Sequence, residues 1–176
     1  MALRSTLRAD FDHFLQLAGG RSSASLWRMA FNPRTLPVLL IRIAISRRFA
    51  VLGPVRALLR LVVMWLFRVE VPKKCHIGPG LVLPHPGGIV LGAGRIGSNV
   101  VIFQNVTLGA RSFDPAYDMS NRPQIGNGVT IGAGAVVLGP VVVGDDATIA
   151  ANSLVVTDIA PRKTAIGVPA TSERRS

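Results

Sequence analysis

The chain has 176 residues, of which 49% are hydrophobic, and a formal net charge of +11. This hydrophobic content excludes a disordered chain, and the length allows one ordinary domain or a repeat domain with a helical appendage. The single Cys75 excludes a disulfide framework, and three His with one Cys supply too few ligands for a structural zinc site. We therefore expect a reducing, cytoplasmic setting and no metal.

The basic charge is concentrated in residues 1–69, which we expect to form an Arg-rich, amphipathic helical segment. Residues 1–70 contain 11 basic and 3 acidic residues, and no acidic residue lies between His13 and Val69. A cleaved secretion signal is not expected, because two Asp residues lie in the opening stretch MALRSTLRADFDHF. Arg residues interrupt the best apolar window, 54–69, so a membrane-spanning helix is not expected either.

The apolar periodicity of this segment predicts helices over 5–18 and 36–67, broken near Gly19-Gly20, Asn32-Pro33 and Gly53-Pro54. In the last helix, aliphatic side chains share one stripe with the Arg residues off it: Val55, Leu58, Leu59, Val62 and Leu66. Two interpretations stay open. Either residues 21–68 dock peripherally on the anionic inner face of the cytoplasmic membrane, or the stripe packs on the rest of the protein or on another subunit. Nucleic acid is not expected as a partner, because the Arg residues lie within apolar helices without interleaved aromatic residues.

From Ile77 onward the sequence repeats in six-residue units rich in Gly, Val, Ile, Ala and Asn. The first position of all twelve units is Ile, Leu or Val, at residues 77, 83, 89, 96, 102, 108, 125, 131, 137, 143, 149 and 155. A period of six fits neither a helix nor a simple alternating strand, but it suits short strands joined by turns, with one aliphatic side chain per unit pointing inward. Three units close a triangular coil of 18 residues, so we expect four stacked coils around an aliphatic core. A right-handed solenoid or a Gly-rich sandwich is the alternative.

These patterns divide the chain into a helical segment, 1–69, a β-helical domain, 70–170, and a short tail, 171–176. A longer loop, 111–123, interrupts the repeats. Gly or Ala at the second position of seven units predicts tight corners, where a larger side chain would meet the neighbouring coil.

His85 lies in the unit LPHPGG, between two prolines at a predicted corner, from which a side chain projects outward. In isolation such a His is usually structural or a surface residue. Cys75 lies ten residues away with no nucleophile signature around it, and buried free Cys is common. A three-His metal site on the coils is not expected, because His13 lies far outside them.

The stretch 69–170 resembles serine acetyltransferases and their relatives in the hexapeptide acyltransferase superfamily. In that family a carboxylate lies fifteen residues before the catalytic His, as Glu70 lies before His85. Further family patterns are I-G-x-G at 77–80, G-I-V-x-G at 88–92, Q-x-V-T-L-G at 104–109 and A-x-G-V-P-A at 165–170. The resemblance implies a left-handed parallel β-helix of about four coils, a homotrimer with shared active sites, and direct acetyl transfer from acetyl-CoA to a hydroxyl group.

The resemblance also implies roles for particular residues. His85 would be the catalytic base, and Glu70 would hold the imidazole tautomer and stabilise the imidazolium. Backbone N–H groups near Gly109 and Ala110 would stabilise the oxyanion. Coenzyme A would lie in a groove between subunits, against Gly109, Ala110, Gly132, Ala133, Ala150, Arg162 and Lys163.

Some residues depart from the serine acetyltransferase pattern. Pro84 stands where that family usually has an Asp that contributes to recognition of the amino group of serine. The loop offers polar side chains as substrate contacts, namely Asp114, Tyr117, Asn121 and Arg122. With the Arg-rich helices, these departures make the chain similar to acetyltransferases of exopolysaccharide synthesis, so we expect as acceptor a sugar hydroxyl of an exopolysaccharide or of its lipid-linked precursor. Serine is the alternative acceptor, and a non-catalytic trimerisation module is the alternative to an enzyme.

Overall fold

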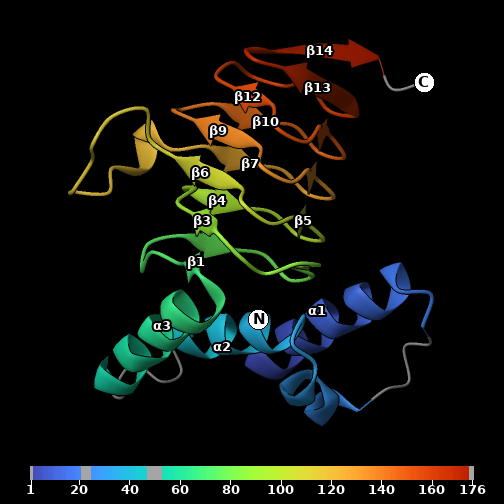
Figure 1. Cartoon of the computed structure of the whole chain (residues 1–176), viewed down its shortest axis with the longest axis vertical. Coiled ribbons are helices and arrows are strands. Elements are labelled where there is room, and N and C mark those ends of the chain that lie inside the picture. Colours follow the sequence, from blue (N-terminus) through green and yellow to red (C-terminus); the bar gives the residue numbers. More distant parts are fainter. Residues whose placement is uncertain (1, 21–24, 47–52, 175–176) are drawn as a thin grey trace.

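Short parallel strands stack into a column, and helices lie at one end of it (Figure 1). The computed structural model describes residues 2–20, 25–46 and 53–174. Parallel strands wound in successive coils fit the predicted left-handed β-helix, and the hand of the coil stays a prediction from the resemblance.

The strands form three sheets, one for each face of the column. The first sheet contains β1 (Val69–Glu70), β3 (Ile89–Leu91), β6 (Thr107–Gly109), β9 (Val136–Leu138) and β12 (Leu154–Val155). The second sheet contains β2 (His76–Ile77), β4 (Arg95–Ile96), β7 (Gln124–Ile125) and β10 (Val142–Val143). The third sheet contains β5 (Val101–Ile102), β8 (Thr130–Ile131), β11 (Thr148–Ile149), β13 (Lys163–Gly167) and β14 (Ala170–Arg174).

The first positions of the six-residue units form the core of the column. Eleven of the twelve predicted side chains are buried, and Ile77 is partly buried against them. First positions of equivalent units pair between coils, as Ile77 does with Ile96 and Ile131 with Ile149. The unit that begins at Ile89 is offset by two residues, because Leu91 and not Ile89 pairs with Leu108. Ile89 and Leu91 are both fully buried, since residues two apart on a strand point to the same side.

Glycines at the corners let neighbouring coils approach closely, as the sequence predicts. A Cβ on Gly97 would lie 2.5 Å from the carbonyl oxygen of Gly126 in the next coil. A Cβ on Gly132 would lie 2.6 Å from the backbone nitrogen of Ala151. The obstacle at both positions is backbone, which cannot rotate away as a side chain can.

The helical segment covers the end of the column near β1 (Figure 1). It consists of α1 (Leu3–Leu17), the 3-10 helix η1 (Leu26–Phe31), α2 (Leu36–Ile45) and α3 (Gly53–Phe67). Val38 and Ile41 of α2 and Val63 of α3 join the core of the column. These helices therefore shield the apolar end of the first coil from water.

The aliphatic stripe of α3 does not pack on the column within this chain. Leu58 is 60% exposed and Leu66 is 69% exposed, whereas Val63, which is not part of the stripe, is buried. Packing of the stripe on the rest of the subunit is therefore wrong. Across 2–20, 25–46 and 53–174, no helix has the length and hydropathy needed to span a membrane. Residues 21–24 and 47–52 of the predicted membrane-contact stretch lie outside the described residues.

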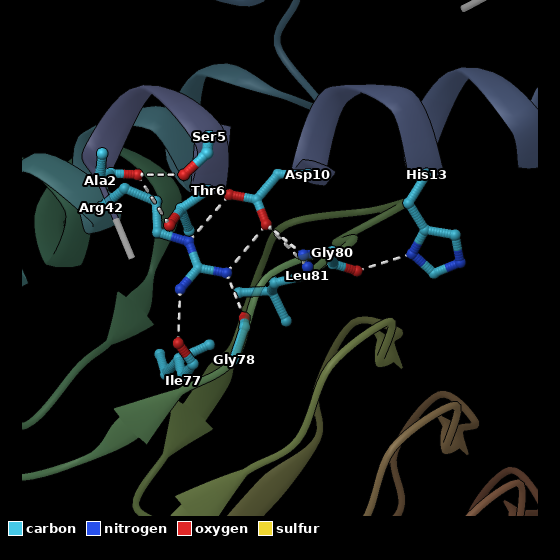
Figure 2. A network of polar contacts seen from close by, with 10 residues as sticks. All are labelled: Ala2, Ser5, Thr6, Asp10, His13, Arg42, Ile77, Gly78, Gly80 and Leu81. Atoms are coloured by element: carbon cyan, nitrogen blue, oxygen red, sulfur yellow. Dashed lines mark hydrogen bonds and ion pairs between the residues drawn. The ribbon is translucent and has the colours of Figure 1, made fainter. Parts of the chain in front are cut away.

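A buried ion pair attaches α1 and α2 to the first coil (Figure 2). The guanidinium of Arg42 donates to both carboxylate oxygens of Asp10 at 2.8 Å, and both side chains are buried. Asp10 also accepts from the backbone N–H groups of Gly80 and Leu81. The Nδ1 of His13 lies 2.6 Å from the carbonyl oxygen of Gly80, so this His, expected far from the coils, contacts the first of them.

The column ends in an antiparallel hairpin of β13 and β14, at the opposite end from the helices (Figure 1). Residues 171–174, which begin the predicted tail, pair with β13 as part of β14. Residues 175–176 lie outside the described residues.

Candidate active site

The turns between the sheets stack into three edges of the column, which we name by their contents. The His85 edge joins the third sheet to the first and contains residues 83–88, 103–106, 132–135 and 150–153. The loop edge joins the first sheet to the second and contains residues 92–94, 110–123, 139–141 and 156–158. The third edge joins the second sheet to the third and contains residues 78–81, 97–100, 126–129, 144–147 and 160–162.

His85 is exposed on the edge that bears its name and lines a cleft of about 560 Å³. Its ring centroid lies 6.4 Å from that of Phe103 in the turn of the next coil. A backbone hydrogen bond from Asn105 to Gly87 holds the two turns together at 2.8 Å. The predicted outward projection of His85 at a corner is thus what the structure has, and the imidazole is open to a substrate.

Glu70 lies on β1, where it is exposed and pairs in register with Val90 of β3. It lines a neighbouring cleft of about 460 Å³, which shares Arg68 and Gly88 with the cleft of His85. In the part of the chain that is described, no hydrogen bond joins the Glu70 carboxylate to the imidazole. The carboxylate and the imidazole therefore line adjoining clefts, and an orienting role for Glu70 stays a prediction.

Gln104 is a residue of the His85 cleft to which the sequence assigned no role. It lines the cleft together with Arg34 and Arg68. The Oε1 atom of Gln104 is buried and has no hydrogen-bond partner within the described residues. Gln104 opens the Q-x-V-T-L-G pattern, so a signal was present, whereas Arg34 lies 51 positions before His85 and had none.

Three of the four predicted substrate contacts in the loop bind one another. Arg122 is buried, forms an ion pair with Asp114 at 2.8 Å, and lies over the ring of Tyr117 at 3.4 Å. It also donates to the carbonyl oxygen of Gly92 at 2.9 Å. These contacts fasten the loop, which includes the 3-10 helix η3 (Met119–Asn121), to the coil beneath it.

The remaining loop residues are arranged around this cluster. Tyr117 donates its hydroxyl to the carbonyl oxygen of Ala93 at 2.9 Å. Asn121 is exposed and donates to Asp118 at 3.2 Å. None of the four predicted contacts lines the cleft of His85 in the same subunit. Substrate contact by these residues therefore requires the cleft of another subunit.

Cys75 lies beneath the loop and is only 5% exposed. Burial raises the pKa of its thiol to about 12, opposed by the positive charge of Arg122 and by a hydrogen bond with Tyr117. Burial also raises the pKa of Tyr117, and the Cys75 charge adds to this effect. A thiol with this pKa is protonated near neutrality, which agrees with a structural Cys75 and not with a nucleophile.

The seven predicted coenzyme A contacts lie on all three edges. Gly132, Ala133 and Ala150 lie in turns stacked along the His85 edge, where Asn152 donates to the carbonyl oxygen of Ala133 at 2.9 Å. Gly109 ends β6 of the first sheet, and Ala110 begins the loop edge. Arg162 and Lys163 lie where the third edge enters β13. One subunit therefore does not bring the seven residues together, and it also separates the predicted oxyanion donors from His85.

The described residues include no group of three or more His, Cys, Asp or Glu side chains placed to hold a metal ion. The later turns of the His85 edge are built from small residues. Gly132, Ala133 and Ala150 carry at most a methyl group and are half-buried.

Comparisons with known proteins relate the chain to hexapeptide-repeat transferases and to serine acetyltransferases. The family described as bacterial transferase hexapeptide (six repeats) matches residues 122–157. A serine acetyltransferase of Helicobacter pylori is 40% identical over 103 residues, which cover 58% of each chain. The soybean serine acetyltransferase apoenzyme has a TM-score of 0.79 and 33% identity, over 97% of this chain and 69% of the other. A serine acetyltransferase in complex with CoA has a TM-score of 0.80 and 26% identity, over 97% and 69%.

These relatives correct the expected acceptor. The curated relatives and solved structures named here are serine acetyltransferases, so the expected sugar hydroxyl is wrong, and the exopolysaccharide branch receives no support from them. The expectation of a bulky sugar acceptor depends on free polar side chains in the loop. Asp114, Tyr117 and Arg122 instead satisfy one another and the coil beneath.

The resemblance extends over nearly the whole of this chain but not over the whole of its relatives. The chain spans less than two thirds of the length of the first curated relatives it matches, 58% in the Helicobacter pylori enzyme. It covers 69% of a soybean relative at 33% identity, helical segment and column together. The chain therefore belongs to the hexapeptide-repeat transferase superfamily, as a homologue of the serine acetyltransferases.

Proposed function

We propose that this protein is an acetyl-CoA-dependent serine O-acetyltransferase. The observation that carries the proposal is the position of His85. It is exposed in a cleft at the helical end of the His85 edge, and the later turns of this edge are built mainly from Gly and Ala. A base at that place can meet a hydroxyl group in the cleft and a thioester lying along the edge. The names of the relatives support serine as the acceptor.

The proposed chemistry is direct transfer without an acyl-enzyme. His85 accepts the proton of the serine hydroxyl as the oxygen attacks the thioester carbonyl. The carbon–sulfur bond then breaks, and the coenzyme A thiolate takes up the proton from the imidazolium. Glu70, in the adjoining cleft, favours the imidazolium by its negative charge and orients the ring, directly or through water.

The separation of the predicted contacts over three edges supports a site shared between subunits. In a closed threefold ring, the His85 edge of one subunit meets a different edge of its neighbour. The backbone N–H groups of Gly109 and Ala110 then stabilise the oxyanion beside the His85 of the neighbour, and the exposed Asn121 of the loop reaches the same cleft. Arg162 and Lys163 attract the phosphates of coenzyme A.

The base is tested by the release of coenzyme A thiol from acetyl-CoA with serine as acceptor. Loss of a general base lowers kcat by about 100- to 10,000-fold, and this is the result we expect for His85→Ala. His76→Ala is the matched control, because His76 is exposed on β2 of the second sheet, away from the cleft. A rate of His85→Ala within threefold of the wild type would remove His85 from the mechanism. If the wild type also releases no thiol, the alternative of a non-catalytic trimerisation module is favoured.

The assembly is tested by light scattering on the purified protein. We expect a mass of three chains of 18.7 kDa each and acetyl transfer that disappears on dilution to monomers. A fully active monomer would contradict a shared site. The exposed aliphatic stripe of α3 could contact either the inner face of the membrane or another subunit. Sedimentation with anionic vesicles tests the membrane contact.

A further inference from the structure

The cleft of His85 has a cationic lining. Arg34, just before α2, and Arg68, just after α3, lie on its wall with the imidazole. Among the residues that the structure describes, no Asp or Glu lines this cleft. An acceptor beside His85 therefore meets a lining with two positive side chains and, among the described residues, no negative one.

Both guanidinium groups are available to a ligand. Arg34 and Arg68 are exposed, and within residues 2–20, 25–46 and 53–174 neither side chain makes a hydrogen bond or an ion pair. The backbone of Arg68 is in the left-handed region, with φ 53°, and its carbonyl oxygen accepts from Ile89 at 3.0 Å. This anchor fixes the Cα of Arg68 between the clefts of His85 and Glu70.

Among the described residues, no carboxylate that could bind an ammonium group lines the cleft beside His85. Pro84, beside His85, has neither charge nor N–H. An ammonium group placed in this cleft would lie near two guanidinium groups, whereas the Glu70 carboxylate lines the adjoining cleft, so the ammonium group is disfavoured. A carboxylate would receive charge-assisted hydrogen bonds, for which the planar guanidinium is well suited.

We propose that Arg34 and Arg68 bind the carboxylate of the acceptor, and that the site accepts short hydroxy acids whether or not they carry an ammonium group. This inference rests on the proposed function and names the acceptor class of the same site. Serine satisfies it through its carboxylate alone. A short hydroxy acid held in this way lies in the same cleft as the imidazole that accepts its hydroxyl proton.

Three matched acceptors separate the two ends of serine. 3-Hydroxypropionate lacks only the ammonium group, and ethanolamine lacks only the carboxylate. We expect kcat/KM for 3-hydroxypropionate to equal or exceed that for serine, and kcat/KM for ethanolamine to be about 100-fold lower, because hydrogen bonds to the charged group are lost. Ethanolamine used as efficiently as 3-hydroxypropionate would overturn the proposal.

Two variants test whether Arg34 and Arg68 bind the carboxylate of the acceptor. Arg34→Gln and Arg68→Gln are expected to raise KM for 3-hydroxypropionate and serine by about tenfold each, with little change for ethanolamine. Arg95→Gln, an exposed Arg on β4 of the second sheet, removes the same charge away from the cleft and should leave KM unchanged. Unfolding curves of all three variants establish that they fold. A KM within twofold of the wild type in both cleft variants would overturn the inference.

The outcomes distinguish this inference from the proposed function. If serine is acetylated in a His85-dependent way but the cleft variants behave as the wild type, the function stands and the inference fails. If no acceptor releases thiol, the function fails, and calorimetry with 3-hydroxypropionate decides the inference by binding alone. Binding that weakens in Arg34→Gln supports it, and absent or unchanged binding overturns it.

Discussion

Cys75 shows how burial sets the chemistry of a single side chain. The thiol lies among the buried core residues, close to Tyr117 and Arg122, and burial raises its pKa from the ordinary value of 9.0 to about 12. In the unfolded chain the thiol ionises near pH 9, whereas in the folded protein it keeps its proton. Between these values the folded state binds more protons, so alkaline pH favours unfolding.

The prediction at this scale concerns stability against pH. The contribution of Cys75 is fully present below pH 9 and is lost as pH rises toward 12. Between pH 8 and pH 10 the free energy of unfolding of the wild type should fall by about 1.4 kcal/mol more than that of Cys75→Ala, as one pKa unit corresponds to 1.36 kcal/mol. Urea unfolding at the two pH values measures it. Equal pH dependence in the two proteins would show that the thiol is not shielded.

At the scale of elements, the junction between helices and column depends on Asp10 and Arg42. Arg42 also donates to the carbonyl oxygen of Ile77, and Asp10 accepts two backbone N–H groups of the same coil. The pair thus satisfies backbone groups that the first coil cannot pair with a preceding one (Figure 2). A buried pair contributes little net stability while intact, but removal of one partner leaves an uncompensated charge.

We therefore expect Arg42→Ala to be strongly destabilising. The free energy of unfolding should fall by about 3–5 kcal/mol, because the Asp10 carboxylate stays buried without its partner. Arg4→Ala, which removes an exposed Arg of α1, should change it by about 0.5 kcal/mol or less. Chemical denaturation followed by circular dichroism measures both. Similar stability of the two variants would mean that the helices do not depend on this pair.

The whole molecule is held by the stacking of one coil on the next. The buried first positions form a continuous core through the column, and the corner glycines allow the coils to approach. Every coil therefore depends on its neighbours, as in other solenoids. A defect at one corner acts on two coils at once.

Gly97 tests this dependence. In Gly97→Ala the added Cβ meets the backbone of Gly126, so we expect a loss of about 1–3 kcal/mol, as for other overpacked sites. In Gly53→Ala the added Cβ meets no atom within 4 Å, and the stability should be unchanged or slightly higher. Thermal unfolding of the two variants measures the difference. A neutral Gly97→Ala would mean that the coils can separate at this corner without cost.

The sequence determined the repeat, the inward aliphatic positions, the corner glycines and the outward projection of His85, because each follows from a period of six within one short segment. Tertiary structure decided the rest. Arg34 and Arg68 reach the cleft of His85 only because the helices fold back onto the first coil. Asp114 and Arg122 of the loop bind each other in the folded subunit. Such contacts join residues far apart in the chain, and no local pattern encodes which of two possible partners a charged side chain finds.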